Sequence, residues 1–235
     1  MLAGDNDSRQ PAVPAAIFDF DGTIVKARVW QSLTSYQLRH RHNLLPALVY
    51  PGLHYLLYLP SRLGLMTRES FIRAWAEHMP WLLCRLRVGD AEKLFEAVVR
   101  ESLAPTLRME AVDELRQRQQ EGCEVILLSG TFEPLLASFG RTIGVRRVVG
   151  TRLEVREGRY TGRGLQPHCH GPGKPARLRQ YLAEEGLALD WRRSYAYGDS
   201  IADAAVLSLV GNPVAVAPDD KLRRHAAAAG WRVLD

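Results

Sequence analysis

Two aspartates near the N-terminus lie two residues apart, directly after a short apolar run. Asp19 and Asp21 follow AAIF in the segment AAIFDFDGTIV, which is bounded by Pro14 and Gly22. An apolar run between turn residues predicts a buried strand, so both carboxylates are expected at its C-terminal end. Carboxylates in such a place are candidates for nucleophilic attack, proton transfer or metal binding.

Polar residues also follow two later strands of the predicted fold. Ser129 and Gly130 come after the apolar segment CEVILL, and Asp199 and Asp203 lie in YGDSIAD. Lys174 lies in the turn GPGKPARL, at the start of a predicted helix. In open α/β sheets, ligands bind beyond the carboxyl ends of the strands. We therefore expect these side chains to meet in one site.

Four carboxylates in one site would carry four negative charges, and Lys174 would offset one of them. Oxygen ligands with room for water and phosphate favour Mg²⁺. Each residue alone has an ordinary explanation, since Asp-Gly is common in turns and Ser129 or Asp199 could cap a helix. Their shared position at the strand-to-helix edge favours a metal-binding catalytic site over these separate explanations.

The elements that must position these residues alternate along the chain from Thr106 onward. Helices are predicted over 107–122, 132–140, 174–186, 201–209 and 219–229, and strands over 123–128, 146–150, 194–199, 213–218 and 231–235. This alternation predicts a parallel sheet with helices on both faces. The segment TRLEVREGRYTG alternates at period two and predicts a β-hairpin.

About eighty residues with helical patterning separate the first two strands, including TRESFIRAWAEHM and DAEKLFEAVVRESL. Residues 42–61 within this insertion carry no formal charge. Prolines at 46, 51 and 60 predict short broken helices there, and neither apolar half approaches the roughly 20 residues of a membrane span. A transmembrane helix is therefore not expected.

Composition limits the compartment and the partners. Net charge is +5, a mild excess that suits anionic substrates without requiring nucleic acid. Cys84, Cys123 and Cys169 are odd in number and widely spaced, which predicts free thiols and a cytoplasmic protein. Residues 1–13 lack the features of a signal peptide and are expected to form a disordered leader. The HCH at 168–170 has no partner ligand pair for zinc and is expected in a loop near the phosphate site.

The motifs DFDGTIV, LLSGT, GKPARL and GDSIADAAVL resemble the four motifs of the haloacid dehalogenase superfamily. The C-terminal segment GNPVAVAPDDKLRRHAAAAGWRVL resembles the phosphoserine phosphatase-like subfamily IB. The resemblance implies an α/β fold with a doubly wound, Rossmann-like parallel sheet. It also implies a catalytic core of residues 14–26 and 106–235, with an α-helical C1 cap of residues 27–105 inserted after the first strand.

The resemblance implies Mg²⁺-dependent hydrolysis of phosphomonoesters through an aspartyl-phosphate. It implies that Asp19 is the nucleophile and that Asp21 is the general acid and base. The implied metal ligands are Asp19, the Asp21 carbonyl and Asp199, and the implied phosphate-binding groups are Ser129, Gly130 and Lys174. Asp203 would orient Lys174 or metal-bound water. Asp21 favours phosphatase over dehalogenase chemistry, which needs no such proton transfer. The alternatives are a phosphotransferase using the same intermediate and a non-catalytic peripheral lipid-binding protein.

The expected cap departs from phosphoserine phosphatases, which bind the substrate ammonium with a glutamate shortly after the first motif. Residues 22–68 contain no Asp or Glu, and their basic residues are Lys26, Arg28, Arg39, Arg41, Arg62 and Arg68. We therefore expect phosphoserine to be a poor substrate. A small or amphiphilic anionic phosphate, such as a lipid phosphate, fits better, and the segment 44–59 either packs within the cap or contacts an anionic membrane.

Overall fold

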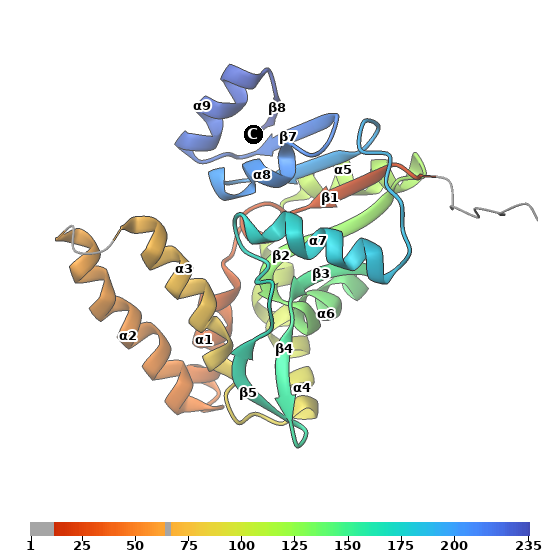
Figure 1. The fold of residues 1–235 in the computed structure, drawn as a ribbon. Helices are drawn as coiled ribbons and strands as arrows, with labels where there is room; N and C mark the ends of the chain where they lie inside the picture. The colour runs from red at the N-terminus through yellow and green to blue at the C-terminus, as the bar shows by residue number, and fades with distance from the viewer. Residues whose placement is uncertain (1–11, 64–66) are drawn as a thin grey trace, which may run out of the picture.

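The computed structural model describes residues 12–63 and 67–235. Its centre is a six-stranded sheet in the order β3-β2-β1-β6-β7-β8, with every neighbouring pair parallel (Figure 1). The strands are β1 (Ala15–Phe18), β2 (Glu124–Phe132), β3 (Arg147–Thr151), β6 (Tyr195–Gly198), β7 (Asn212–Val216) and β8 (Arg232–Leu234). The predicted α/β class and parallel sheet are confirmed.

Helices cover both faces of this sheet because its central strands are apolar on both sides. In β1, Ala16 and Phe18 contact one buried cluster, and Ala15 and Ile17 contact the other. The first cluster includes α5 (Met109–Gln120) and α6 (Glu133–Ile143). The second includes α7 (Gly173–Glu184), α8 (Ala204–Leu207) and α9 (Asp220–Ala229). This arrangement is the doubly wound fold that the sequence predicts.

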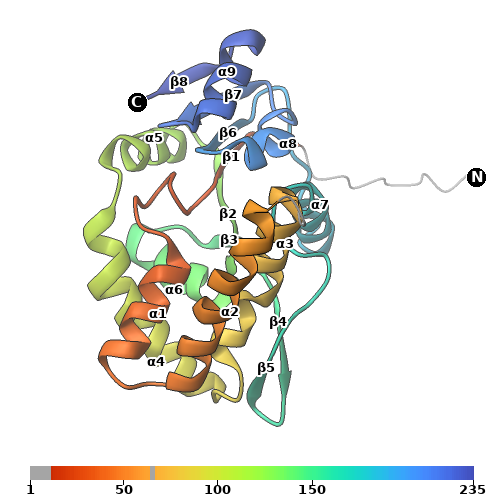
Figure 2. The ribbon, with the colours of Figure 1, turned by 90° about the vertical axis from the view of Figure 1, so that its left-hand side faces the viewer.

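A helical segment follows β1 before the chain returns to the sheet at α5. It consists of α1 (Val29–Arg39), α2 (Leu44–Arg62), α3 (Arg68–His78), the 3₁₀-helix η1 (Met79–Leu83), α4 (Val88–Val98), the π-helical turn η2 (Val99–Leu103) and the 3₁₀-turn η3 (Ala104–Thr106). Figure 2 shows α1, α2 and α4 at the end of the molecule opposite to α9. The helical insertion is confirmed, and its exact boundaries stay a prediction.

The hairpin over 151–162 is confirmed as β4 (Leu153–Arg156) and β5 (Arg159–Gly164). Its backbone is bonded to the helical segment, because Arg85 N–H donates to the Tyr160 carbonyl at 2.8 Å and Val88 N–H donates to the Gly158 carbonyl at 3.0 Å. The hairpin, which follows β3 in the chain, therefore connects the helical segment to the sheet through these hydrogen bonds.

Three local predictions need correction. Residues 44–62 form one helix with Pro51 and Pro60 inside it, rather than short broken helices. Strand β2 continues to Phe132 across an irregular register, so Ser129 and Gly130 lie within its end rather than after it. The helix predicted over 201–209 is a 3₁₀-turn, η4 (Ile201–Asp203), followed by the short α8.

Most of the predicted leader, residues 1–11, lies outside the described residues. Val13 is already paired, since it forms a parallel β-bridge with Leu189. No helix in the described ranges has the length and apolarity needed to cross a membrane. The three cysteines are unpaired, as expected.

Candidate active site

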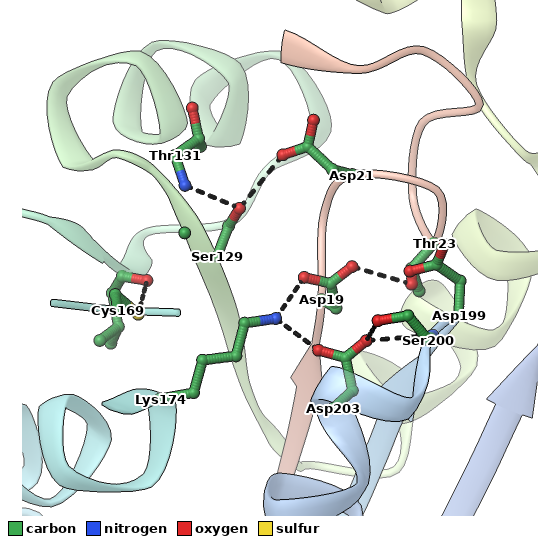
Figure 3. Close-up of polar contacts among 12 residues, drawn as sticks. Asp19, Asp21, Thr23, Ser129, Thr131, Cys169, Lys174, Asp199, Ser200 and Asp203 are labelled. Carbon is green, nitrogen blue, oxygen red and sulfur yellow. Dashed lines mark hydrogen bonds and ion pairs between the residues drawn. The ribbon is translucent and has the colours of Figure 1, made fainter. Parts of the chain in front are cut away.

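The predicted site residues gather at the carboxyl ends of β1, β2 and β6, where α7 begins (Figure 3). Because β1 lies between β2 and β6, residues far apart in the chain reach the same sheet edge. Asp19 N–H donates to the Tyr197 carbonyl at 2.9 Å, which continues the β1–β6 pairing to Asp19.

Lys174 links two of the aspartates. Its buried ammonium donates to Asp19 Oδ1 and to Asp203 Oδ1, each at 2.6 Å. The other oxygen of Asp203 accepts from Ser200 N–H and Oγ–H at 3.2 and 2.9 Å, so Asp203 is held by the turn that starts η4. This contact is the geometry that the predicted orienting role of Asp203 requires, and the role itself stays a prediction.

Asp21 turns away from this ion-pair network, toward the end of β2 (Figure 3). Its Oδ1 accepts from the Val29 N–H at 2.6 Å, at the start of α1, and its Oδ2 accepts from Ser129 Oγ–H at 3.3 Å. Ser129 Oγ in turn accepts from the Thr131 N–H at 3.1 Å. Asp19 and Asp21 thus have different partners, which suits two different chemical tasks.

Gly22 allows the chain to turn between these aspartates and the carboxylate of Asp199. Its φ is +94°, and a Cβ at this position would lie 2.2 Å from Asp199 Oδ2. Thr23, one residue later, donates from Oγ1 to Asp19 Oδ2 at 3.1 Å. The tight loop after β1 therefore brings Asp199 close to the backbone of the first motif.

Arg28 is a site residue that the sequence analysis did not place there. Its Nη1 donates to the Asp21 carbonyl oxygen at 2.7 Å, and its Nη2 donates to Asp199 Oδ2 at 3.1 Å. About half of its side chain is exposed. The available signal was its position as the first arginine after DFDGTIV, in a stretch without acidic residues.

Burial opposes ionisation of the carboxyl groups in this site. It raises the pKa of Asp19, with Lys174 opposing the change, and it raises the pKa of Asp199, with Arg28 opposing it. Burial also raises the pKa of Asp21. For Lys174 burial disfavours the charged form, but Asp19 and Asp203 outweigh it and raise the pKa. The carboxylates therefore need further positive charge to stay ionised together.

A divalent cation fits this donor set. Asp19, Asp199 and Asp203 each offer an oxygen, and the three oxygens lie within 4.8 Å of one another. Both oxygens of Asp203 already accept hydrogen bonds, from Lys174 and from Ser200. Asp19 and Asp199 are therefore the better side-chain ligands. The Asp21 carbonyl and Asp199 are also predicted ligands, and both accept hydrogen bonds from the positively charged guanidinium of Arg28.

The HCH segment lies against Gly130, one of the predicted phosphate-binding residues. A Cβ on Gly130 would lie 3.3 Å from the Cys169 carbonyl and 3.5 Å from His170 Nδ1. Cys169 is buried, and burial raises the pKa of its thiol to about 12. A neutral buried thiol is a poor metal ligand. The loop packs against Gly130, and its nearness to a phosphate site stays a prediction.

Known proteins share the fold of this chain. A family model for haloacid dehalogenase-like hydrolases matches residues 16–208. The chain belongs to this family. A crystal structure of a Bordetella pertussis Tohama I protein of unknown function is 31% identical, covers 95% of this chain and 99% of that chain, and has a TM-score of 0.82. The predicted resemblance to haloacid dehalogenase hydrolases and the predicted fold are confirmed.

Two curated relatives of this family align over nearly the whole chain. Phosphoserine phosphatase SerB1 of Mycobacterium tuberculosis (strain H37Rv) is 31% identical over 242 residues, which is 100% of this chain and 75% of the relative. Histidinol-phosphatase of Neisseria meningitidis serogroup C is 28% identical over 222 residues, which is 94% of this chain and 97% of the relative. Against the first relatives matched, the chain spans about half of their length.

Proposed function

We propose that this protein is a Mg²⁺-dependent phosphomonoester hydrolase that acts through an aspartyl-phosphate on Asp19. The observation that carries the proposal is that two carboxylates at one sheet edge have different hydrogen-bond partners. Asp19 is held by Lys174 and Thr23, whereas Asp21 is held by Ser129 and the Val29 N–H. These different partners support attack by Asp19 and proton transfer by Asp21.

In the first step, an Asp19 oxygen attacks phosphorus and the bond from phosphorus to the substrate oxygen breaks. Asp21 gives its proton to that leaving oxygen, so the alcohol departs neutral. In the second step, Asp21 takes a proton from water, the water oxygen attacks phosphorus, and inorganic phosphate leaves Asp19. The pKa of Asp21 is raised by burial, which keeps the proton available for the first step.

Three groups are proposed to bind the phosphoryl oxygens. Lys174 Nζ already lies 2.6 Å from Asp19 and carries the charge that a phosphoryl group requires. Ser129 Oγ and the Gly130 N–H lie at the end of β2, beside Asp21. Donors fixed by the fold stabilise the charge that develops during transfer without reorganising.

The chemistry of Mg²⁺ in this site would be to neutralise the repulsion between Asp19 and the phosphate. Asp19, the Asp21 carbonyl and Asp199 would hold it. With Asp21 protonated, Asp19, Asp199 and Asp203 carry three negative charges and Lys174 and Arg28 offset two of them, so one divalent cation would leave the cluster with a net positive charge for the incoming phosphate. Asp203 would keep Lys174 in place.

The substrate is proposed to be a small phosphomonoester with a second anionic or an apolar group. Arg28 supports this class, because its guanidinium has five N–H groups, two of which are used, and half of the side chain is exposed. A second anion on the substrate can bind the remaining N–H groups. The helices of residues 27–105 would act as the cap that selects this substrate.

The names of the relatives supply two comparison substrates, phosphoserine and histidinol phosphate. Both carry an amino group, for which Arg28 is an unfavourable neighbour. Phosphoserine also carries a carboxylate that Arg28 could bind, whereas histidinol phosphate does not. We expect both to be poorer substrates than a phosphate with a second anion and no ammonium. The three unpaired cysteines support a reducing compartment, so we propose a cytoplasmic enzyme.

The testing experiment measures phosphate release from a panel of amino-acid, sugar, nucleotide and lipid phosphates, with Mg²⁺ and with EDTA. We expect hydrolysis of at least one phosphomonoester, its loss in EDTA and its return with excess Mg²⁺. Adding candidate alcohol acceptors separates hydrolysis from phosphotransfer. Activity that persists in EDTA, or no release from any class, would contradict the proposal.

A further inference from the structure

The outer side of α2 carries an unusual concentration of exposed apolar side chains. Among the described residues, fourteen large hydrophobic side chains are exposed, and eight of these lie in residues 44–63. The most exposed are Leu45 at 73%, Tyr55 at 70% and Leu56 at 68%. Scattered single apolar residues are normal on a surface, but a cluster of this kind on one element indicates a binding surface.

Five of these residues form one continuous face, which we call the α2 outer face: Leu45, Leu48, Val49, Tyr55 and Leu56. Their spacing of three, four and seven residues places them on the same side of a helix. Gly52 lies in the gap of this spacing, and a Cβ there would meet no atom within 4 Å. The exposed face therefore continues along α2 for about three turns.

The opposite side of α2 is already satisfied by packing. Ala47, Tyr50 and His54 are buried, and Tyr50 Oη–H donates to the Trp75 carbonyl of α3 at 3.0 Å. In Figures 1 and 2, α1 and α3 lie between α2 and the sheet, so the outer face points away from the molecule. A helix that is apolar on all sides requires cover on its second side as well.

The charges around this face favour an anionic surface as the cover. Residues 42–61 carry no formal charge, and residues 22–68 contain no acid. Arg39 and Arg41 are exposed immediately before α2, and within the described part of the chain neither guanidinium pairs with a carboxylate. An ordinary protein interface has a polar rim, whereas an uncharged face bordered by arginines matches the interface of an anionic bilayer.

We propose that the α2 outer face docks on the surface of an anionic membrane, with α2 parallel to the bilayer plane. Leu45, Leu48 and Leu56 enter the boundary between headgroups and acyl chains, and Tyr55 lies at the headgroup level. Arg39 and Arg41 contact lipid phosphates. This contact goes beyond the proposed hydrolase activity and does not depend on it.

The test is co-sedimentation of the full chain with vesicles of phosphatidylcholine alone and of phosphatidylcholine mixed with phosphatidylglycerol, at low and high salt. We expect sedimentation with the mixed vesicles and little with phosphatidylcholine alone. High salt should weaken the association, because it screens exposed arginines. Neither lipid is a phosphomonoester, so binding as a substrate cannot be mistaken for docking.

The test variant is Leu45→Gln with Leu56→Gln, which removes two exposed apolar side chains and keeps helix-compatible residues. We expect its partition onto mixed vesicles to fall at least about tenfold, since each leucine loses its burial. Met109→Gln with Val155→Gln is the matched control, because these are two exposed apolar side chains elsewhere, at 49% and 45%. The control should bind as the wild type does, and both variants should keep the wild-type unfolding temperature.

Arg39→Gln with Arg41→Asn should lose the preference for phosphatidylglycerol while the melting temperature stays unchanged. The proposal is overturned if the wild type does not sediment with either vesicle, or if the Leu45 and Leu56 variant sediments as the wild type does. It is also overturned if light scattering shows a wild-type dimer that the same variant dissolves, in the absence of vesicle binding. That result would assign the face to a second copy of the chain.

Discussion

Asp21 is the side chain whose substitution separates proton transfer from the rest of the chemistry. Asp21→Asn keeps the shape and can still accept from the Val29 N–H through its amide oxygen, but it cannot give up a proton. We expect kcat to fall by about 10² to 10⁴, the usual contribution of general acid–base catalysis. Steady-state kinetics with a slow alcohol leaving group measures this loss.

The pH profile gives an independent reading of Asp21. Because burial raises the pKa of Asp21, the protonated acid persists to higher pH than an ordinary carboxyl does. The wild-type kcat should therefore decline on the alkaline side, as Asp21 loses its proton. In Asp21→Asn this alkaline decline should be absent, and its persistence would assign the proton transfer to another group.

Arg28 is the residue at which substrate preference is expected to change. Arg28→Glu replaces the half-exposed guanidinium with a carboxylate, which repels a second anion and attracts an ammonium. We expect kcat/KM for a doubly anionic phosphate to fall by about tenfold to a hundredfold, as for loss of a charged hydrogen bond. Histidinol phosphate, which carries an ammonium and no carboxylate, should improve relative to it.

Arg39→Gln is the control for Arg28, because it removes a positive charge from the last residue of α1, whereas Arg28 immediately precedes the first residue. Arg39 Nε donates to the Ser35 carbonyl and contacts no site carboxylate. If Arg39→Gln and Arg28→Gln lower kcat/KM for the doubly anionic substrate equally, the preference comes from the overall field rather than from Arg28.

At the scale of the elements, the loop between β1 and α1 controls the metal ligands. In Gly22→Ala a Cβ would lie 2.2 Å from Asp199 Oδ2, and the φ of +94° is unfavourable for alanine. We expect a loss of about 1 to 3 kcal/mol in the free energy of unfolding, from this backbone strain. Displacement of Asp199 should also weaken Mg²⁺ binding, measured by calorimetry, by about tenfold or more.

Gly52→Ala is the matched control for Gly22→Ala. Gly52 lies inside α2, has no positive φ, and has open space around its Cβ position. Replacing a helical glycine with alanine should raise the free energy of unfolding by about 0.5 to 1 kcal/mol and leave Mg²⁺ affinity unchanged. Equal Mg²⁺ affinities for the two variants would show that the loop does not set the position of Asp199.

The elements differ in how far local sequence determines them. The strands of the sheet were predictable, because each is a short apolar run between turn residues, as in AAIF before Asp19. Helix α2 was predicted wrongly, since its prolines indicate breaks. Pro46 lies in the first turn, where no N–H partner is required, and burial of Ala47, Tyr50 and His54 keeps the helix continuous past Pro51.

The site shows the same limit. Asp19, Asp21, Lys174, Asp199 and Asp203 were predictable because each follows a recognisable strand or starts a helix. Arg28 was not, because its contact with Asp199 crosses 171 positions of the chain and depends on the turn at Gly22. Spacing along the sequence carries no information about such a contact.

At the scale of the whole molecule, buried carboxylates couple stability to pH and to metal. Burial raises the pKa of Asp19 from 3.8 to about 8, and the pKa of Asp199 is raised in the same direction. When the pKa of a carboxyl group is higher in the folded state than in the unfolded state, the group stabilises the folded protein below its unfolded-state pKa. This contribution is lost as pH rises through the folded-state pKa. Without metal, the melting temperature should therefore fall between about pH 4 and about pH 8.

Mg²⁺ should reverse this loss, because it favours the ionised carboxylates. At about a hundredfold excess over its Kd, a ligand adds about 2.7 kcal/mol, or roughly 5 to 10 °C in a domain of this size. Thermal melts at both ends of the pH window should show a larger Mg²⁺ shift at the alkaline end. A shift of equal size at both ends, or the same shift in Asp199→Asn, would contradict the coupling.

The central claim is that Asp19 carries the phosphoryl group during turnover, and the direct test is mass spectrometry of the acid-quenched enzyme. Wild-type protein mixed with Mg²⁺ and its best substrate should gain one phosphoryl group, located on the peptide that contains Asp19. Asp19→Asn should gain none and should release phosphate only at the background rate, because an amide does not attack phosphorus. A phosphoryl group on another residue, or near wild-type turnover by folded Asp19→Asn, would contradict the account.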